Sequence, residues 1–368
     1  MDVFEYGDEE VSRKEIMLGT TSMVIGIGIL TLPRLVATAT QSSDGWMSIA
    51  IAGMLAIVLA WVAAKLASRF PKMSFITYTG LIVTKPVAMI LSCVIFIYFF
   101  LFSAYVTRGI ANIAKQYLFD DTPIEVIALV YILIVTYAVA GTRVGLLRLN
   151  MLFIPIVLII IACLLAFSSN LVEPSNLKPF FVSSWSGILL GVKESIFSLL
   201  GFEVILFYIS NMNRPQEAPK AVIIGMVIPV LLYLFVYLFV ISVFSIEATR
   251  EVIYPTIELA KEIVLPGEFF ERFESLFFLI WIMTIFNTGS MAFDVCILAI
   301  GSLFKNVRKM IWIWIITPFV FIAAMMPQDL IDYTNLGEYI SYLGLLIAGI
   351  MPISLLLIAI IRGVKGHS

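Results

Sequence analysis

The sequence predicts an all-α integral membrane protein with about ten transmembrane helices, and three observations predict it. The 368 residues are 61% hydrophobic and only 13% charged, and the mean hydropathy is +1.06. A soluble domain of this length has no use for so many apolar residues, whereas apolar runs of about 20 residues span a bilayer as helices. Such runs follow one another along the whole chain, and basic residues gather in every second connection between them.

The runs are bounded by charged and turn-forming residues, which set the ends of the predicted spans. The acidic N-terminus lacks the basic region of a cleaved signal peptide, so the first run is predicted to stay as a span. The chain is predicted to form one polytopic domain over 1–368. The ten predicted spans are 15–36, 46–67, 86–116, 124–140, 151–167, 186–210, 221–244, 273–303, 311–326 and 336–361.

The charged residues predict the orientation of the chain. Acidic residues fill the alternate connections: Asp120, Asp121, Glu247, Glu251, Glu258, Glu262, Glu268, Glu271, Asp329 and Asp332. Basic residues fill the others: Arg13, Lys14, Arg69, Lys72, Arg143, Arg148, Arg214, Lys220, Lys305, Arg308, Lys309, Arg362 and Lys365. The positive-inside rule places the basic connections and both termini in the cytoplasm, and an even number of spans agrees with this.

One acidic connection, 245–272, is much longer than the rest. Residues 254–263 within it have apolar residues at helical spacing with charges between them. This pattern predicts short amphipathic helices on the outer face, which would act as a lid. A solvated connector fits the pattern equally well.

Two glycine-marked interruptions lie in corresponding runs of the two halves. The first involves Ile25, Gly26, Gly28 and Ile29, and the second involves Leu199, Leu200, Gly201 and Glu203. Paired interruptions of this kind are typical of transporters whose substrate binds near the bilayer midplane. Unwound backbone there exposes N–H and C=O groups where water is scarce, so these groups require a ligand, an ion or a cavity.

The first interruption suits a carboxylate. Gly26 and Gly28 weaken the helix, and Pro33 removes one more backbone donor. A helix that restarts near Ile29 would direct free N–H groups at its positive end toward the break. The alternative is a helix-packing face, because glycines also let two backbones approach closely.

Intramembrane charges mark a second set of candidates, because each needs a partner or a function. Glu203 lies in the second break, where it would pair with a ligand ammonium, hold a proton or cap unwound backbone. Lys193 and Glu194 precede it and are predicted to point in different directions. Asp294 and Arg108 would form a structural contact or part of a proton path.

Aromatic and polar side chains in the third and eighth spans would complete a ligand pocket. Tyr98 and Phe102 share one helix face at a spacing of four residues. Asn287 and Thr288 lie in the eighth span. Contacts between helices are the alternative role for each of them.

The composition argues against an enzyme. His367 is the only histidine, and Cys93, Cys163 and Cys296 lie far apart in apolar runs. No histidine cluster, catalytic triad or histidine base can be assembled from these residues, so neither a metal nor a cofactor is expected.

Several motifs spread over essentially the whole chain resemble the spore germination permease family. This family comprises the B subunits of bacterial germinant receptors, within the amino acid–polyamine–organocation superfamily. The motifs are GIGILTLP at 26–33, DGW at 44–46, TPI at 122–124, LGFE at 200–203, YPTI at 254–257 and ERFES at 271–275. The Gly-x-Gly break is shared with ordinary amino-acid transporters, whereas ERFES and YPT are more particular to the germination family.

The resemblance implies a LeuT-like fold of two inverted five-helix repeats, here 1–170 and 185–362, with the first and sixth helices broken. It further implies a small nutrient germinant, commonly an amino acid, as ligand and the spore inner membrane as location. An A subunit and a lipoprotein C subunit are the implied partners, and nucleic acid is not. Some proton-coupled relatives carry a lysine in the fifth span, but residues 151–165 contain no ionisable side chain.

The sequence therefore supports two main hypotheses. In the first, a germinant binds at the midplane site and shifts a conformational equilibrium that partner subunits detect. In the second, the chain is a proton- or sodium-coupled amino-acid transporter. A channel subunit for ions or water is a third alternative.

Overall fold

The computed structural model describes residues 10–263, 273–304 and 306–366. Secondary structure in this part of the chain is helical, apart from one isolated backbone bridge between Val11 and Met212. The charged residues Glu268, Glu271 and Lys305, the start of the ERFES motif and His367 lie outside the described residues.

The first half of the chain contains α1 to α7. Their bounds are α1 (Arg13–Ile25), α2 (Gly28–Thr40), α3 (Gly45–Ala67), α4 (Phe75–Ile82), α5 (Lys85–Tyr117), α6 (Ile124–Ala140) and α7 (Arg143–Ser168). The second half contains α8 to α15. Their bounds are α8 (Trp185–Ser198), α9 (Ile205–Tyr208), α10 (Ala218–Glu251), α11 (Pro255–Lys261), α12 (Phe273–Leu303), α13 (Lys309–Met325), α14 (Leu330–Leu345) and α15 (Met351–Ile361).

These helices account for the ten predicted spans. By length and composition, six continuous segments of the described chain can cross a membrane, and the bent pair α1–α2 makes a seventh. The shorter helices α6 and α13 and the interrupted segment from α8 to α9 lie where the other three spans are predicted. A single π-helical turn, Leu346–Ile350, joins α14 to α15 within the last span.

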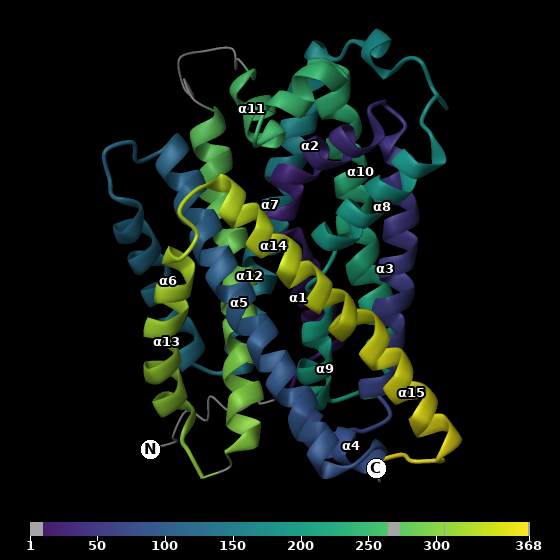
Figure 1. Cartoon of the computed structure of the whole chain (residues 1–368), viewed down its shortest axis with the longest axis vertical. Helices are drawn as coiled ribbons and strands as arrows, with labels where there is room; N and C mark the ends of the chain where they lie inside the picture. The colour runs from purple at the N-terminus through teal and green to yellow at the C-terminus, as the bar shows by residue number, and fades with distance from the viewer. Residues whose placement is uncertain (1–9, 264–272, 305, 367–368) are drawn as a thin grey trace, which may run out of the picture.

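The helices form an upright bundle around α1 (Figure 1), which contacts α7, α10 and α12. Helix α12 packs along α5, and α3 packs along α10. Helix α11 lies across the upper end of Figure 1, and α4 lies at the lower end. We call the upper end, which carries Asp44, Asp120 and Glu258, the acidic end. The lower end, where α1, α7 and α13 begin, is the basic end.

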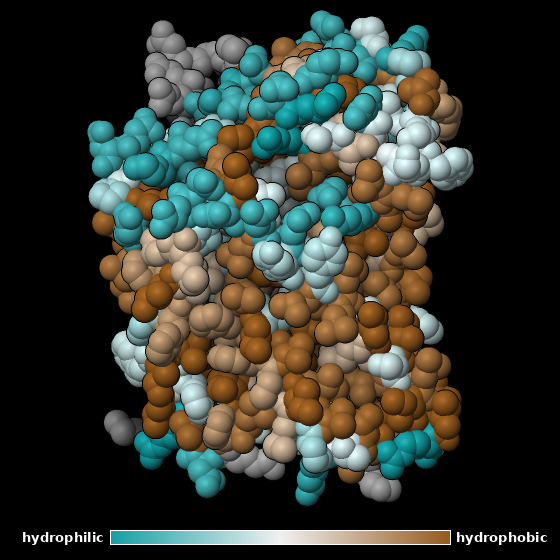
Figure 2. Space-filling view, viewed as in Figure 1, coloured by the Kyte–Doolittle hydropathy of each residue, from teal (hydrophilic) through white to brown (hydrophobic). Residues whose placement is uncertain are grey.

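The surface matches a bilayer. Figure 2 shows hydrophobic side chains over the middle and lower part of this face, with hydrophilic side chains gathered at both ends. Leu152, Ile159 and Ile90 are each more than 60% exposed, as side chains that face lipid are. The middle of the bundle is therefore apolar where the surface of a soluble protein would be polar, which suits contact with lipid.

Several predicted span ends are wrong, and the reason is that charged residues extend the helices beyond the apolar runs. The fifth helix begins at Arg143 rather than 151, because its first turns carry cations that pair with buried carboxylates of other helices. The tenth begins at Leu330 rather than 336, with Asp329 as its N-cap. The seventh continues to Glu251 rather than 244, through a non-helical Ser245.

The long acidic connection is mostly helical where it is described. Residues 245–251 continue α10, and α11 follows, so the predicted short helices are present. Thr256 of α11 donates a hydrogen bond of 2.8 Å to the Ile29 carbonyl of α2, beside the first break. The connection is therefore attached to the bundle rather than only solvated, while residues 264–272 lie outside the described residues.

Asp44 fastens the acidic end of α3 to the segment before α8. Its buried carboxylate accepts backbone N–H bonds from Phe181, Val182 and Ser183, at 2.6, 2.7 and 2.9 Å. Burial raises the pKa of this carboxyl, but the backbone bonds outweigh burial and hold the pKa below its usual value. A group of this kind stabilises the fold above its unfolded pKa, and the stabilisation is lost as the pH falls through the folded value.

Replacing Asp44 by Ala is therefore expected to lower the free energy of unfolding by about 2–3 kcal/mol at pH 7. The loss should shrink below about pH 4, where the wild-type carboxyl becomes protonated. Thermal unfolding of purified protein at both pH values measures it. Exposed Asp121 is the matched control, and Asp121→Ala should have little effect. An equal loss for Asp44→Ala at both pH values would contradict an ionised anchor.

Candidate ligand-binding site

The first break separates α1 from α2 by a bend of 52°. Helix α1 ends at Gly26 and α2 restarts with Ile27 as its N-cap, whose side chain makes no capping hydrogen bond. The flanking Ile25 and Ile29 are completely buried. The predicted break is thus present, and the backbone around it faces the centre of the bundle.

The two glycines of this break are also positions of close approach. A Cβ at Gly26 would lie 3.0 Å from the Thr288 hydroxyl of α12. A Cβ at Gly28 would lie 2.8 Å from the Tyr233 hydroxyl of α10 and 3.0 Å from the Ser198 carbonyl of α8. The helix-packing role therefore applies, because the glycines admit neighbouring side chains, and they also end a helix as predicted; the carboxylate contact stays a prediction.

Two side-chain hydroxyls donate hydrogen bonds to backbone carbonyls that the break leaves free. Tyr233 donates to the Val24 carbonyl at 2.8 Å and contacts the Ser198 carbonyl at 3.3 Å, so it links the two broken segments. Thr288 lies 3.2 and 3.4 Å from the carbonyls of Ser22 and Met23. Tyr233, Ser198 and Met23 were missed in the sequence analysis, although a tyrosine in the middle of an apolar span was a usable signal.

The second break lies directly against the first. Gly201 has a φ of 118°, which suits glycine, and a Cβ there would lie 3.2 Å from the Met23 carbonyl. Glu203 follows it and is completely buried. One carboxylate oxygen accepts the Tyr98 hydroxyl at 2.5 Å, and the other accepts the Gly201 N–H at 2.9 Å. Glu203 therefore caps unwound backbone and joins α5 to the break.

Apolar side chains close the space beside Glu203. Tyr98 and Phe102 have ring centroids 5.9 Å apart on one face of α5. Leu200 and the Tyr98 hydroxyl both approach Gly344 of α14, where an added Cβ would lie 2.5 and 3.1 Å from them. Leu199 is fully buried. The predicted residues Tyr98, Phe102, Leu199 and Leu200 thus come from α5 and the second break, and Gly344 of α14 packs against them.

Helix α12 carries polar atoms without partners at the level of the first break. Both side-chain amide atoms of Asn287 lack a hydrogen bond among the described residues, although Asn287 is 1% exposed. The hydroxyls of Thr284 and Ser290 on α12 and of Ser22 on α1 also lack one within that part of the chain. Buried polar groups are normally paired, so these atoms are candidates for hydrogen bonds to a small polar ligand.

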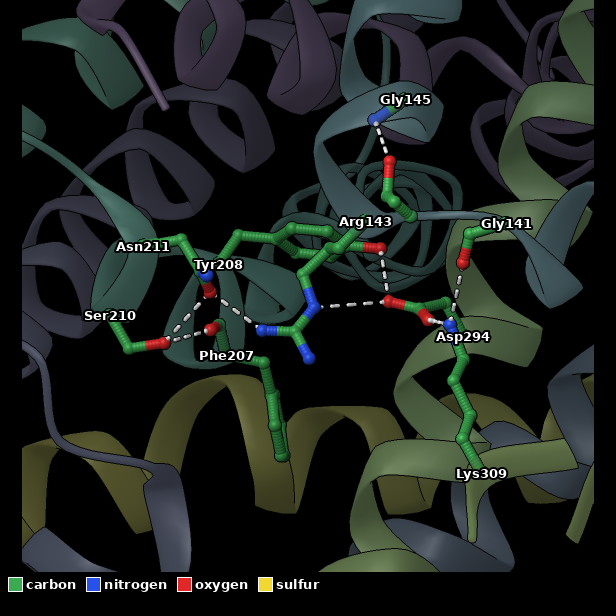
Figure 3. Close-up of polar contacts among 10 residues, drawn as sticks. Gly141, Arg143, Gly145, Phe207, Tyr208, Ser210, Asn211, Asp294 and Lys309 are labelled. Atoms are coloured by element: carbon green, nitrogen blue, oxygen red, sulfur yellow. Dashed lines mark hydrogen bonds and ion pairs between the residues drawn. The ribbon is translucent and has the colours of Figure 1, made fainter. Parts of the chain in front are cut away.

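A separate charged cluster closes the basic end (Figure 3). Asp294 of α12 is completely buried and lies 3.4 Å from Arg143 Nε and 3.2 Å from Lys309 Nζ. Tyr208 of α9 donates to Asp294 at 3.1 Å, and Arg143 donates to Asn211 at 2.6 Å. The cluster ties α7, α12 and α13 to the segment after the second break.

Of the alternatives open for Asp294 and Arg108, a contact between the two does not form, and Asp294 contacts another arginine instead. Asp294 pairs with cations at the basic end, whereas Arg108 lies toward the acidic end of α5 and has no ion pair among the described residues. Lys193 and Glu194 do not point apart as predicted, since Lys193 Nζ lies 4.0 Å from Glu194. Lys193 also pairs with Glu338 at 3.3 Å and is one-third exposed, so these charges lie at the rim.

The fold and the site together define a class of protein, a multi-pass membrane protein with a central site between two broken helices. The solved structure of MhsT in complex with L-phenylalanine has the same fold. It matches with a TM-score of 0.68 and 13% identity, covering 95% of this chain and 98% of MhsT. The chain thus has the LeuT-like fold of two inverted five-helix repeats, with the first and sixth spans broken.

The chain belongs to the spore germination permease family. A family model described as spore germination protein matches residues 10–333. Spore germination protein GerLB of Bacillus cereus is 42% identical, over 99% of this chain and 97% of that protein. Spore germination protein YndE of Bacillus subtilis (strain 168) is 32% identical, over 91% and 92%. This family is permease-like, in agreement with the resemblance found in the sequence.

Proposed function

We propose that the protein is the germinant-sensing membrane subunit of a spore germination receptor. A small nutrient, an amino acid in the first instance, binds between the two breaks, and its binding shifts the equilibrium between two conformations. A ligand shifts such an equilibrium only through a difference in its affinity for the two states. The unpartnered polar atoms of Asn287, which precedes the Thr288 that lies against Gly26, are the observation that carries this proposal.

The charged cluster at the basic end supports the proposed equilibrium between two conformations. Asp294 joins α12 to α7 and α13 through ion pairs, so a closed basic end is one arrangement of this bundle. Ligand contacts at the break would favour or oppose that arrangement. The proposal includes location in the spore inner membrane, both termini in the cytoplasm, and association with an A subunit and a lipoprotein C subunit. It also treats 1–170 and 185–362 as the two repeats.

A coupled amino-acid transporter is the second candidate. Glu203 favours it, because a completely buried carboxylate beside the site is a group that can carry a proton. Uptake of a labelled amino acid by the purified chain in liposomes would support this alternative. Binding without uptake would support the sensor.

Asn287→Leu tests the proposed site. Leucine has nearly the same volume and no polar atoms, so two unpaired buried groups disappear. We expect normal or raised protein abundance in spores, and a germinant dose–response curve shifted at least about tenfold, because a hydrogen bond to the ligand is lost. The panel of germinants should contain amino acids, sugars and nucleosides.

Asn150→Leu is the matched control. Asn150 of α7 is equally buried, and its Oδ1 also lacks a partner among the described residues, but its Nδ2 donates to the Leu146 carbonyl at 2.7 Å within its own helix, away from the break. This variant should leave the midpoint of the response in place. An unshifted curve for an abundant Asn287→Leu protein would remove Asn287 from the site and contradict the proposal.

A further inference from the structure

Arg108 is a buried cation that the described chain leaves uncompensated. The residue is only 8% exposed, its Nε has no hydrogen-bond partner in the described residues, and it forms no ion pair with them. Arg143 at the basic end differs, because its side chain is 23% exposed, pairs with Asp294 and donates a hydrogen bond to Asn211. Burying a guanidinium without an anion is costly, so a position of this kind calls for a negative partner.

The residue next to Arg108 packs against the first break and against α14. A Cβ on the next residue, Gly109, would lie 2.4 Å from the Tyr333 hydroxyl of α14 and 2.6 Å from Ile27. The Tyr333 ring stacks on Tyr105, with centroids 4.4 Å apart and planes within 1° of parallel. The Tyr333 hydroxyl, like Arg108 Nε, has no hydrogen bond of normal geometry in the described chain. Two unpartnered donors therefore lie one layer above the break.

A pocket of about 400 Å³ lies at the acidic end, and residues of α5 and α14 line part of it. Asn112 lines this pocket from α5, one helical turn from Arg108, and Leu330 lines it from α14, one turn from Tyr333. Lys115 adds a cation to its wall and Asp120 an anion. The pocket therefore lies about one helical turn outward of both Arg108 and Tyr333.

We propose that Arg108 and Tyr333 form an outer binding station for a carboxylate, through which the ligand passes to the break. The role of this station depends on the proposed function. The station restricts the ligand to molecules that carry a free carboxylate. A guanidinium holds a carboxylate through two parallel hydrogen bonds, and a tyrosine hydroxyl adds a third donor. The stacked tyrosine rings would cover the apolar part of the ligand.

Arg108→Met tests the station without the germinant, by thermal unfolding of the purified full chain. Methionine fills similar space without charge, so the ligand-free variant should melt about 3 °C higher than wild type. Benzoate at about 50 mM should raise the melting temperature of wild type and not of Arg108→Met, and neutral benzamide should raise neither. Arg143→Met, which breaks an existing ion pair, is the matched control and should melt lower than wild type.

Two results would overturn the station. A melting temperature of Arg108→Met below that of wild type would mean that the chain itself already pairs the guanidinium. Equal effects of benzoate on wild type and Arg108→Met, including no effect on either, would mean that no carboxylate binds there. Either result leaves the Asn287→Leu experiment intact, so failure of the station and failure of the proposed function are distinguishable.

Discussion

Glu203→Ala is expected to cost about 3–5 kcal/mol of folding free energy, the largest loss of any single change proposed. The substitution leaves the Tyr98 hydroxyl and the Gly201 N–H buried without partners and opens a cavity between α5 and the second break. Each unsatisfied donor costs about 1–3 kcal/mol, and the cavity adds to this. Protein abundance in membranes and the melting temperature of purified protein measure the loss.

Glu203→Gln separates charge from shape. Glutamine keeps the volume and one acceptor, so the protein should remain abundant. A charge-assisted hydrogen bond is roughly twice as strong as a neutral one, so the germinant response should weaken about tenfold. An unshifted Gln curve beside a damaged Ala curve would assign Glu203 to backbone capping alone and leave Asn287 and Thr288 as the ligand contacts.

Tyr98→Phe is the matched control for this pair. It removes the Tyr98–Glu203 hydrogen bond that Glu203→Gln weakens, so the double variant with Glu203→Gln should lose less than the sum of the two single losses. Additive losses would mean that the 2.5 Å contact contributes little to either property.

Asp294→Ala is expected to have the second-largest effect, by opening the basic end. Removing a completely buried carboxylate leaves Arg143, Lys309 and the Tyr208 hydroxyl without it. The cost should be about 2–4 kcal/mol, less than for a fully buried pair, because Lys309 is one-third exposed and can be hydrated. The germination response should change as well, because one closed arrangement is weakened.

The rate at which the Cys296 thiol is labelled measures this opening. Its thiol is completely buried on α12, two residues from Asp294, and faces the Phe96 carbonyl of α5. In a background with Cys93 and Cys163 replaced by Ala, a membrane-permeant maleimide should label Cys296 faster in Asp294→Ala than in the parent. Lys309→Gln, which removes only the more exposed partner, should have a smaller effect. Equal labelling rates in all three proteins would contradict a closing role for Asp294.

The contacts of the charged residues mark the limit of sequence analysis for this chain. Glu203 was recognised as a buried group with three possible roles, and its partner Tyr98 was named, yet nothing in the spacing joined one to the other. Asp294 was assigned the wrong partner, because residues 143 and 309 lie far from 294 in the chain and were counted only for orientation. Ion pairs between helices depend on helix rotation and vertical offset, which residue spacing along one helix does not report.

The sequence by itself determined the class of protein, the approximate spans, both breaks and the family. Each of these follows from local physics: apolar runs must match bilayer thickness, and glycines weaken a helix wherever they occur. Only the tertiary structure decided which carbonyls Tyr233 and Thr288 reach, and that the Asn287 amide and Arg108 Nε find no hydrogen-bond partner in the described part of the chain. Whether a buried polar group is satisfied depends on atoms that other helices bring to it, and that arrangement exists only once the bundle is packed.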